Sequence, residues 1–275
     1  MIFAGCDVGS LTAKAVVLET NKDNINPVVI SSELMGVRPL PEQSATEIMQ
    51  RALDAINISF EDIDVCCSTG YGREEIPFAD FNISEISCHA KGVYFTDPLV
   101  RAIIDIGGQD LKAIRIDDQG RLVDFKMNNR CAAGTGKFLE VSAQVLGISI
   151  EDLGPLSFKS RKNISVTGQC SIFAEMEVTR KLYSGIKKAD LAAAINKAMA
   201  LRISALAKKI VHGAPSCITG GVSKNIGVVA NLEKILGMSF EKISFDPQMI
   251  GALGAALYAK EYFNTRLAKQ EKRLA

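Results

Sequence analysis

The chain has 275 residues, of which 47% are apolar and 23% are charged. This length and composition are typical of a globular protein with two modest domains. The formal net charge of +1 gives little support to nucleic-acid or membrane-surface binding. No stretch approaches the roughly 20 apolar residues of a membrane-spanning helix, and the early Asp7 speaks against a signal peptide. Seven cysteines, an odd number, indicate a reducing cytoplasm rather than a disulfide framework.

The N-terminal residues predict a β-hairpin that binds phosphate. Two apolar strands flank a tight turn that starts at Asp7 and ends at Lys14. Gly9 would let backbone amides approach a phosphate, Lys14 would add a cation, and Asp7 would hold Mg²⁺ through water. The candidate nucleotide contacts are Gly9, Ser10, Leu11, Thr12, Ala13 and Lys14. Such a turn standing alone is more often a plain hairpin.

The same design returns later in the chain. A strand ends at Asp105, a turn with Gly107 and Gly108 follows, and an alternating strand leaves the turn. Asp7, Asp105 and Gln109 are therefore candidate catalytic residues. A third strand meets a helix at Gly220-Gly221, where a ribose or a ring would lie against bare backbone. Residues 251–257 then predict a helix of small residues that allows close packing.

Two cysteines each precede a predicted helix. Cys131 comes before a helix over about 136–146, and Cys170 comes before a helix over about 171–183. The free N–H groups and partial positive charge of a helix N-terminus favour a thiolate or an anionic cluster. Two thiolates cannot complete a four-cysteine iron–sulfur site, but a two-fold symmetric dimer supplies four. Burial as a small apolar side chain is the competing interpretation.

The remaining cysteines have simpler interpretations. Cys6, Cys66, Cys67 and Cys217 lie in apolar strands and are expected in the core, and Cys88 beside His89 is expected to be structural. Residues 134–137 imitate a phosphate-binding P-loop, but phenylalanine stands where serine or threonine is required. The predicted helix over 189–211 has an apolar stripe that is expected to pack in the core.

The order of these elements resembles the actin, hexokinase and heat-shock chaperone ATPase superfamily. The resemblance implies an α/β fold with two related, ribonuclease H-like domains around a nucleotide cleft, two mixed sheets and helices outside. It makes the Asp7 and Asp105 turns the two phosphate loops and Gly220-Gly221 the adenosine segment. The expected boundaries are 1–97 for the first domain, to which a helix over 250–262 returns, 98–249 for the second, and 263–275 for a C-terminal tail.

Five stretches narrow the resemblance to the activator ATPases of 2-hydroxyacyl-CoA dehydratases, a family that includes the ATPase subunits of benzoyl-CoA reductase. They are Asp105 to Asp110, Asn128 to Gly136, Cys170 to Glu175, Thr69 to Arg73 and Glu85 to Ala90. The family implies a homodimer or pseudo-symmetric pair that shares one 4Fe–4S cluster. Cys131 and Cys170 take the ligand positions, and Glu140, Gly221 and Gln248 take positions of nucleotide contacts. Asn128-Asn129-Arg130 and Thr167-Gly168-Gln169 depart from many relatives, which leaves the recipient enzyme open.

The expected activity is therefore ATP-dependent electron transfer. ATP turnover with Mg²⁺ would drive single electrons from the cluster to a dehydratase or reductase, and ferredoxin or flavodoxin would be the donor, as the resemblance implies. Two alternatives remain open. A small-molecule kinase of this fold, such as an amino-sugar kinase, would need a sugar pocket that residues 80–85 do not clearly offer, and an actin- or chaperone-like ATPase would need insertions that this chain lacks.

Overall fold

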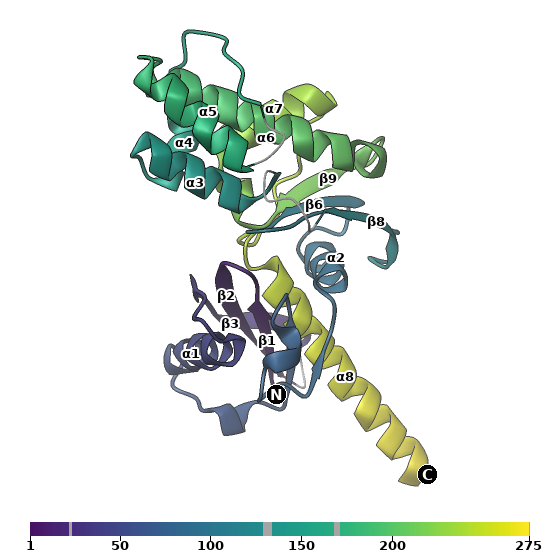
Figure 1. Cartoon of the computed structure of the whole chain (residues 1–275). Helices are drawn as coiled ribbons and strands as arrows, with labels where there is room; N and C mark the ends of the chain where they lie inside the picture. The colour runs from purple at the N-terminus through teal and green to yellow at the C-terminus, as the bar shows by residue number, and fades with distance from the viewer. Residues whose placement is uncertain (22–23, 129–133, 168–170, 275) are drawn as a thin grey trace. The chain divides into compact units, whose positions relative to one another are not determined.

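The computed structural model describes residues 1–21, 24–128, 134–167 and 171–274. The chain forms two compact units (Figure 1). The first unit contains Met1–Leu99, Asp117–Leu122 and Ile243–Ala275, and the second contains Val100–Ile116 and Val123–Lys242.

The first unit is built on a five-stranded mixed sheet in the order β3-β2-β1-β4-β5. Its first three strands are antiparallel neighbours, whereas β4 and β5 join in parallel. Helix α1 contacts the sheet mainly through β2 and β3, and α8 contacts β1 and β4 (Figure 1). The bounds are β1 Ile2–Val8, β2 Thr12–Asn21, β3 Asn24–Gly36, α1 Pro41–Asp54, β4 Val65–Thr69, β5 Phe81–Asn82, α2 Glu85–Thr96 and α8 Ile250–Leu274.

Strand β1 is buried on both faces because helices cover both sides of it. Alternate side chains of a strand point to opposite faces. Ala4 and Cys6 belong to the same apolar cluster as residues of α1, whereas Gly5 and Asp7 face the first turns of α8. A Cβ at Gly5 would lie too close to the backbone of Ala252. The glycine therefore lets α8 reach the end of β1 where Asp7 stands.

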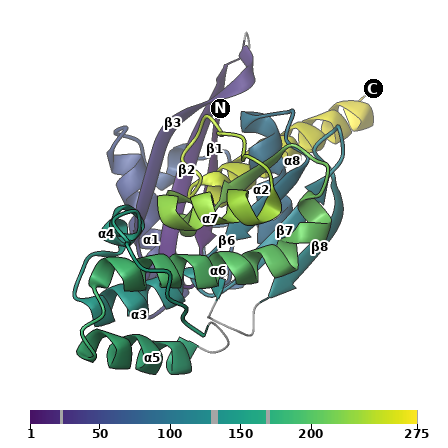
Figure 2. The same ribbon diagram turned by 90° about the horizontal axis from the view of Figure 1, so that it is seen from above.

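The second unit is built on a four-stranded sheet in the order β8-β7-β6-β9. Helix α6 packs on this sheet and forms the centre of the helical layer, with α7 on one side of it and α3 and α5 on the other (Figure 2). The bounds are β6 Ala102–Ile106, β7 Leu111–Ile116, β8 Leu122–Asn128, α3 Gly136–Leu146, α4 Ile150–Ser157, α5 Ser171–Tyr183, α6 Lys188–Val211, β9 Ser216–Thr219 and α7 Ile226–Leu236.

The structure tests the sequence predictions for two long helices, α6 and α8. The apolar stripe of α6 lies in the core of the second unit, as predicted. The helix predicted over 250–262 is longer than expected and includes residues 263–274 of the expected tail, because α8 runs from Ile250 to Leu274 without a break. Residues 266–274 consist entirely of strong helix formers (Arg, Leu, Ala, Lys, Gln and Glu), so the helix has no local reason to stop.

The cysteines expected in the core are buried thiols. Cys6, Cys66, Cys67, Cys88 and Cys217 carry no disulfide in the described part of the chain. Burial raises the pKa of the Cys67 thiol to about 12 and that of the Cys88 thiol well above its ordinary value. These thiols are therefore unsuited to act as nucleophiles at neutral pH. In the described helices we find no segment with both the length and the apolar character of a membrane span.

A buried aspartate joins a loop of the second unit to α6. The Asp190 carboxylate accepts hydrogen bonds from the backbone N–H groups of Arg161 at 2.8 Å and Lys162 at 3.0 Å, and these bonds lower its pKa. A carboxylate with a lowered folded-state pKa stabilises the fold above its unfolded pKa of about 3.9 and loses that contribution as the pH falls through the folded value.

We therefore expect the Asp190→Asn variant to lose less stability than the wild type on acidification. Urea unfolding from about pH 6 to about pH 2 measures the slope, and stability contributed by this carboxylate disappears only below about pH 4. Asp118→Asn, at an exposed position, is the control and should keep the wild-type slope. Equal slopes for Asp190→Asn and the wild type would contradict the assignment.

Candidate nucleotide site

Asp7 stands at the end of β1 in a buried row of polar side chains. In the strand register it lies opposite Lys14 of β2 and Thr69 of β4. The Lys14 ammonium donates to Oδ2 of Asp7 at 3.1 Å, and both side chains are about nine-tenths buried. A buried charge is stable only when paired. The sheet therefore holds the Asp7 carboxylate in a defined place at the edge of the first turn.

The first turn is closed by backbone hydrogen bonds. The N–H of Gly9 donates to the carbonyl of Thr12 at 3.0 Å, and the N–H of Val37 donates to the carbonyl of Leu11 at 3.1 Å. Gly9, Ser10, Leu11 and Thr12 are partly exposed, whereas Ala13 is buried in the core. The turn thus exposes backbone and hydroxyl groups, and the Ala13 side chain packs in the core.

Asp105 stands in an equivalent row in the second unit. It lies opposite Lys112 of β7 and Thr219 of β9. The Lys112 ammonium is 3.3 Å from Oδ2 of Asp105 and 2.5 Å from Oδ2 of Asp110. The Thr219 hydroxyl donates to Oδ1 of Asp105 at 3.1 Å. Asp105 is thus held by a cation and a hydroxyl at the mouth of the second turn.

The two units repeat one arrangement of lysine, aspartate and threonine on adjacent strands. In both hairpins the lysine follows the aspartate by seven residues. Each threonine precedes a glycine with positive φ, Gly70 at 87° and Gly220 at 81°, where any side chain would be strained. Sequence reasoning missed Lys112 and both threonines. The seven-residue spacing of Asp7 and Lys14, which is repeated by Asp105 and Lys112, is the sequence signal that could have found Lys112.

The second turn is bonded to the start of α3. The N–H of Gly136 donates to the carbonyl of Gly107 and the N–H of Lys137 donates to the carbonyl of Gly108, both at 2.9 Å. One turn into the helix, Glu140 forms an ion pair with Lys137 at 2.7 Å. Gly107, Gly108 and Glu140 therefore share one local structure, joined through the first turn of α3.

The other predicted residues are not members of these rows, although Gln109 and Gly221 follow Gly108 and Gly220 directly. Gln109 is exposed, and Gly221 is exposed at the start of a 3₁₀ turn, Gly221–Lys224. Gln248 belongs to the first unit, where its N–H donates to the Asp246 carboxylate at 2.8 Å. Cys131 and Cys170 lie outside the described residues. Within the described ranges, three or more His, Cys, Asp or Glu side chains nowhere gather as metal ligands.

Each aspartate row suits a phosphate–magnesium ligand. Carboxylate oxygens are the ligands that Mg²⁺ prefers, and glycine turns present backbone N–H groups to phosphate. The turns at Gly9 and at Gly107-Gly108 stand directly beside Asp7 and Asp105. The residues present therefore fit a Mg²⁺–nucleotide.

The chain is similar over nearly its whole length to proteins that are named as ATPases or activators. The chain is 40% identical over 258 residues to the (R)-2-hydroxyglutaryl-CoA dehydratase activating ATPase of Acidaminococcus fermentans, covering 93% of this chain and 95% of that protein. The solved structure of the activator of the 2-hydroxyisocaproyl-CoA dehydratase from Clostridium difficile with bound ADPNP matches with a TM-score of 0.89 at 36% identity. That match covers 100% of this chain and 98% of the other.

A more distant match shows the fold alone. A ROK family glucokinase from Streptomyces griseus, solved with glucose and AMPPNP, matches with a TM-score of 0.54 at 12% identity, covering 95% of this chain and 100% of the other. The predicted actin- and hexokinase-like α/β fold is thereby confirmed. The model of the BadF/BadG/BcrA/BcrD ATPase family matches residues 4–259. The chain therefore belongs to the BadF/BadG/BcrA/BcrD ATPase family.

Proposed function

We propose that this protein is an ATP-dependent one-electron activator of a 2-hydroxyacyl-CoA dehydratase or of an acyl-CoA reductase-type partner. The observation that carries the proposal is the pair of lysine–aspartate–threonine rows beside two glycine turns, in a chain of an ATPase family. A relative that is 40% identical is named a dehydratase activating ATPase.

Each glycine turn is a proposed phosphate-binding element. We assign phosphate contacts to Gly9, Ser10 and Thr12 in the first unit and to Gly107 and Gly108 in the second. Asp7 and Asp105 would hold Mg²⁺ and orient the hydrolytic water, since buried carboxylates beside phosphate loops suit both tasks. Glu140, Gly220, Gly221 and Gln248 are proposed contacts to the rest of ATP or ADP, and Gln109 is a proposed catalytic residue.

Cys131 and Cys170 are the proposed ligands of a 4Fe–4S cluster. A 4Fe–4S site needs four thiolates, so the proposal includes a dimer in which two copies contribute two cysteines each. The cluster supplies low-potential electrons when it is bound. Cys131 lies close in sequence to α3, whose first turn is bonded to Gly107 and Gly108. A change at this phosphate turn would therefore reach the cysteine-bearing segment through α3.

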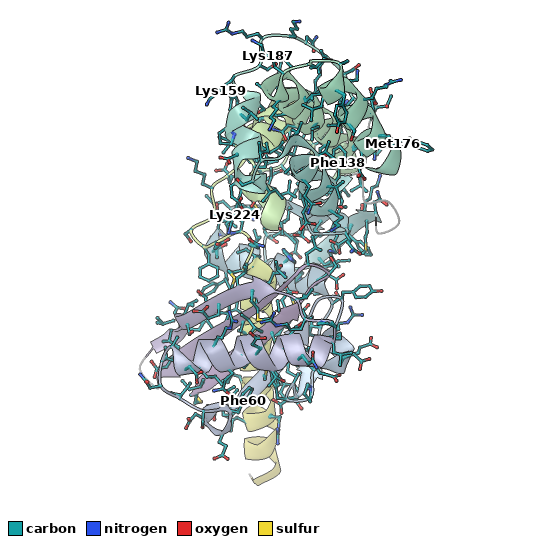
Figure 3. All side chains as sticks on the ribbon, turned by 60° about the vertical axis from the view of Figure 1, so that its left-hand side comes forward. Phe60, Phe138, Lys159, Met176, Lys187 and Lys224 are labelled. Carbon is teal, nitrogen blue, oxygen red and sulfur yellow. The ribbon has the colours of Figure 1, made fainter. Side chains whose placement is uncertain are left out.

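Helix α5 supports a dimer next to the proposed ligands. It follows Cys170 directly and exposes three large side chains, Phe173 at 70%, Met176 at 64% and Tyr183 at 88%. Figure 3 shows Met176 directed away from the unit, whereas Phe138 of α3 points into the helical core. Exposed apolar groups along one helix are typical of an interface. A second copy is the partner that would also complete the four-cysteine site.

The remaining partners follow from the same assignment. A 2-hydroxyacyl-CoA dehydratase or an acyl-CoA reductase is the proposed electron acceptor, and a ferredoxin or flavodoxin is the proposed donor. The buried thiols of the described chain form no disulfide, which suits a reducing cytoplasm.

Anaerobic purification of variants that each lack one cysteine tests whether the protein binds the cluster. We expect the wild type to contain about four iron and four sulfide per two chains, whereas Cys131→Ala and Cys170→Ala lose the cluster and the visible absorption that accompanies it. Cys67→Ala, which removes a buried strand thiol, is the matched control and should keep the full iron content. ATP hydrolysis is measured on the same samples.

Two results would overturn the proposal. The first is a full complement of iron and sulfide in the Cys131→Ala variant. The second is a colourless, iron-free wild type that transfers phosphate to a sugar, which would favour the kinase alternative.

A further inference from the structure

The row around Asp7 lacks a hydrogen bond that the row around Asp105 possesses. In the second unit the Thr219 hydroxyl donates to Asp105 at 3.1 Å. In the first unit the equivalent threonine, Thr69, is 0% exposed, and its hydroxyl interacts with the Cys88 thiol of α2 instead of donating to Asp7. The two aspartates are thus held in different ways.

A histidine lies beside Asp7. His89 of α2 is 6% exposed, and its imidazole lies next to Gly251 in the first turn of α8. A Cβ at Gly251 would lie 2.8 Å from Oδ2 of Asp7 and 3.2 Å from Nε2 of His89. The carboxylate and the imidazole therefore both lie next to the position that a Cβ of residue 251 would occupy. Glycine at residue 251 keeps this position free of a side chain.

The packing of α2 on α8 fixes this arrangement. A Cβ at Gly254 would lie 2.8 Å from the Cα of Cys88, the residue before His89. A Cβ at Gly92 would lie 3.0 Å from a side-chain carbon of Ile250. The two helices therefore touch through their backbones, and the histidine has little freedom to move away from Asp7.

We propose that His89 is a positioning residue for Asp7. The imidazole holds the carboxylate from the side of α8, as the Thr219 hydroxyl holds Asp105 in the second unit. Lys14 holds the same carboxylate from β2. His89 thereby sets how Asp7 meets the magnesium ion of a bound nucleotide, and this role rests on the nucleotide function proposed above.

The test compares His89→Gln with His212→Gln, because the chain has only two histidines. His212 is exposed at the end of α6 and is the matched control. Calorimetry measures the binding of ADPNP with and without Mg²⁺, and steady-state ATPase assays give kcat and KM. Outer partners of metal ligands are typically worth about 10–100-fold in metal affinity or activity.

We expect His89→Gln to lose about 10-fold or more of the Mg²⁺-dependent gain in ADPNP affinity and of kcat. Binding without Mg²⁺, and KM for ATP, should stay within about two-fold of the wild-type values, because the phosphate turns are untouched. Gly251→Ala places a methyl group against both the carboxylate and the imidazole, so it should reproduce the defect even if His89→Gln folds poorly.

Three results separate the possible failures. Wild-type Mg²⁺ dependence in both His89→Gln and Gly251→Ala would overturn the positioning role while leaving the nucleotide function intact. Equal losses with and without Mg²⁺ would reduce His89 to a packing residue and also overturn it. A wild type that binds no Mg²⁺–ADPNP would overturn the nucleotide function and the positioning role together.

Discussion

Replacing Lys112 by methionine is expected to lower the free energy of unfolding by about 3–5 kcal/mol. The side chain of Lys112 is only 3% exposed, and its ammonium contacts the carboxylates of Asp105 at 3.3 Å and Asp110 at 2.5 Å. Methionine has a similar length but leaves two carboxylates without their cation. The Asp105 carboxylate is 5% exposed and cannot gain full hydration in its place.

Urea unfolding of the second unit, followed by circular dichroism, measures this loss. Lys126→Met, at an exposed position of the neighbouring strand β8, is the matched control and should change stability by no more than about 0.5 kcal/mol. The Lys112→Met/Asp105→Asn double variant should lose less than the two single variants added together, because it removes the more deeply buried of the two carboxylate charges that lose their cation in Lys112→Met. Additive losses would show that the pair is not coupled.

Replacing Gly254 by alanine is expected to destabilise the first unit, although alanine favours a helix by about 1 kcal/mol over glycine. The added Cβ would lie 2.5 Å from the carbonyl carbon and 2.8 Å from the Cα of Cys88. Backbone atoms cannot rotate aside as a side chain does, so α2 and α8 must separate. Overpacking of this kind costs about 1–3 kcal/mol, occasionally more, and we expect a net loss of at least about 2 kcal/mol.

Thermal unfolding of the variant measures the effect. Gly36→Ala is the control, because a Cβ at Gly36 would meet no atom within 4 Å. This variant should keep the wild-type melting temperature within experimental error. A Gly254→Ala variant that is as stable as the wild type would contradict the backbone contact between α2 and α8.

Local sequence patterns were sufficient for the elements and the turns. Apolar strands around Asp7 and Asp105 predicted both hairpins, because alternation and glycine turns act over a few residues. The helices over 136–146 and 171–183 were predicted within the bounds observed. The C-terminal helix was predicted too short. The prediction relied on the small residues at 251–257, whereas the strong helix formers at 266–274 extend the helix to Leu274.

The sequence by itself determined the fold family, the position of both aspartate turns, the core role of Cys6, Cys66, Cys67 and Cys217, and the structural role of Cys88. It did so because strand and turn preferences are local and repeat in both units. Only the tertiary structure decided which groups surround each aspartate. Thr219 stands 114 residues from the carboxylate that it holds, and His89 lies near Asp7 because Gly251 and Gly254 let two helices pack closely. Such contacts depend on the packing of distant elements, and no pattern of neighbouring residues encodes them.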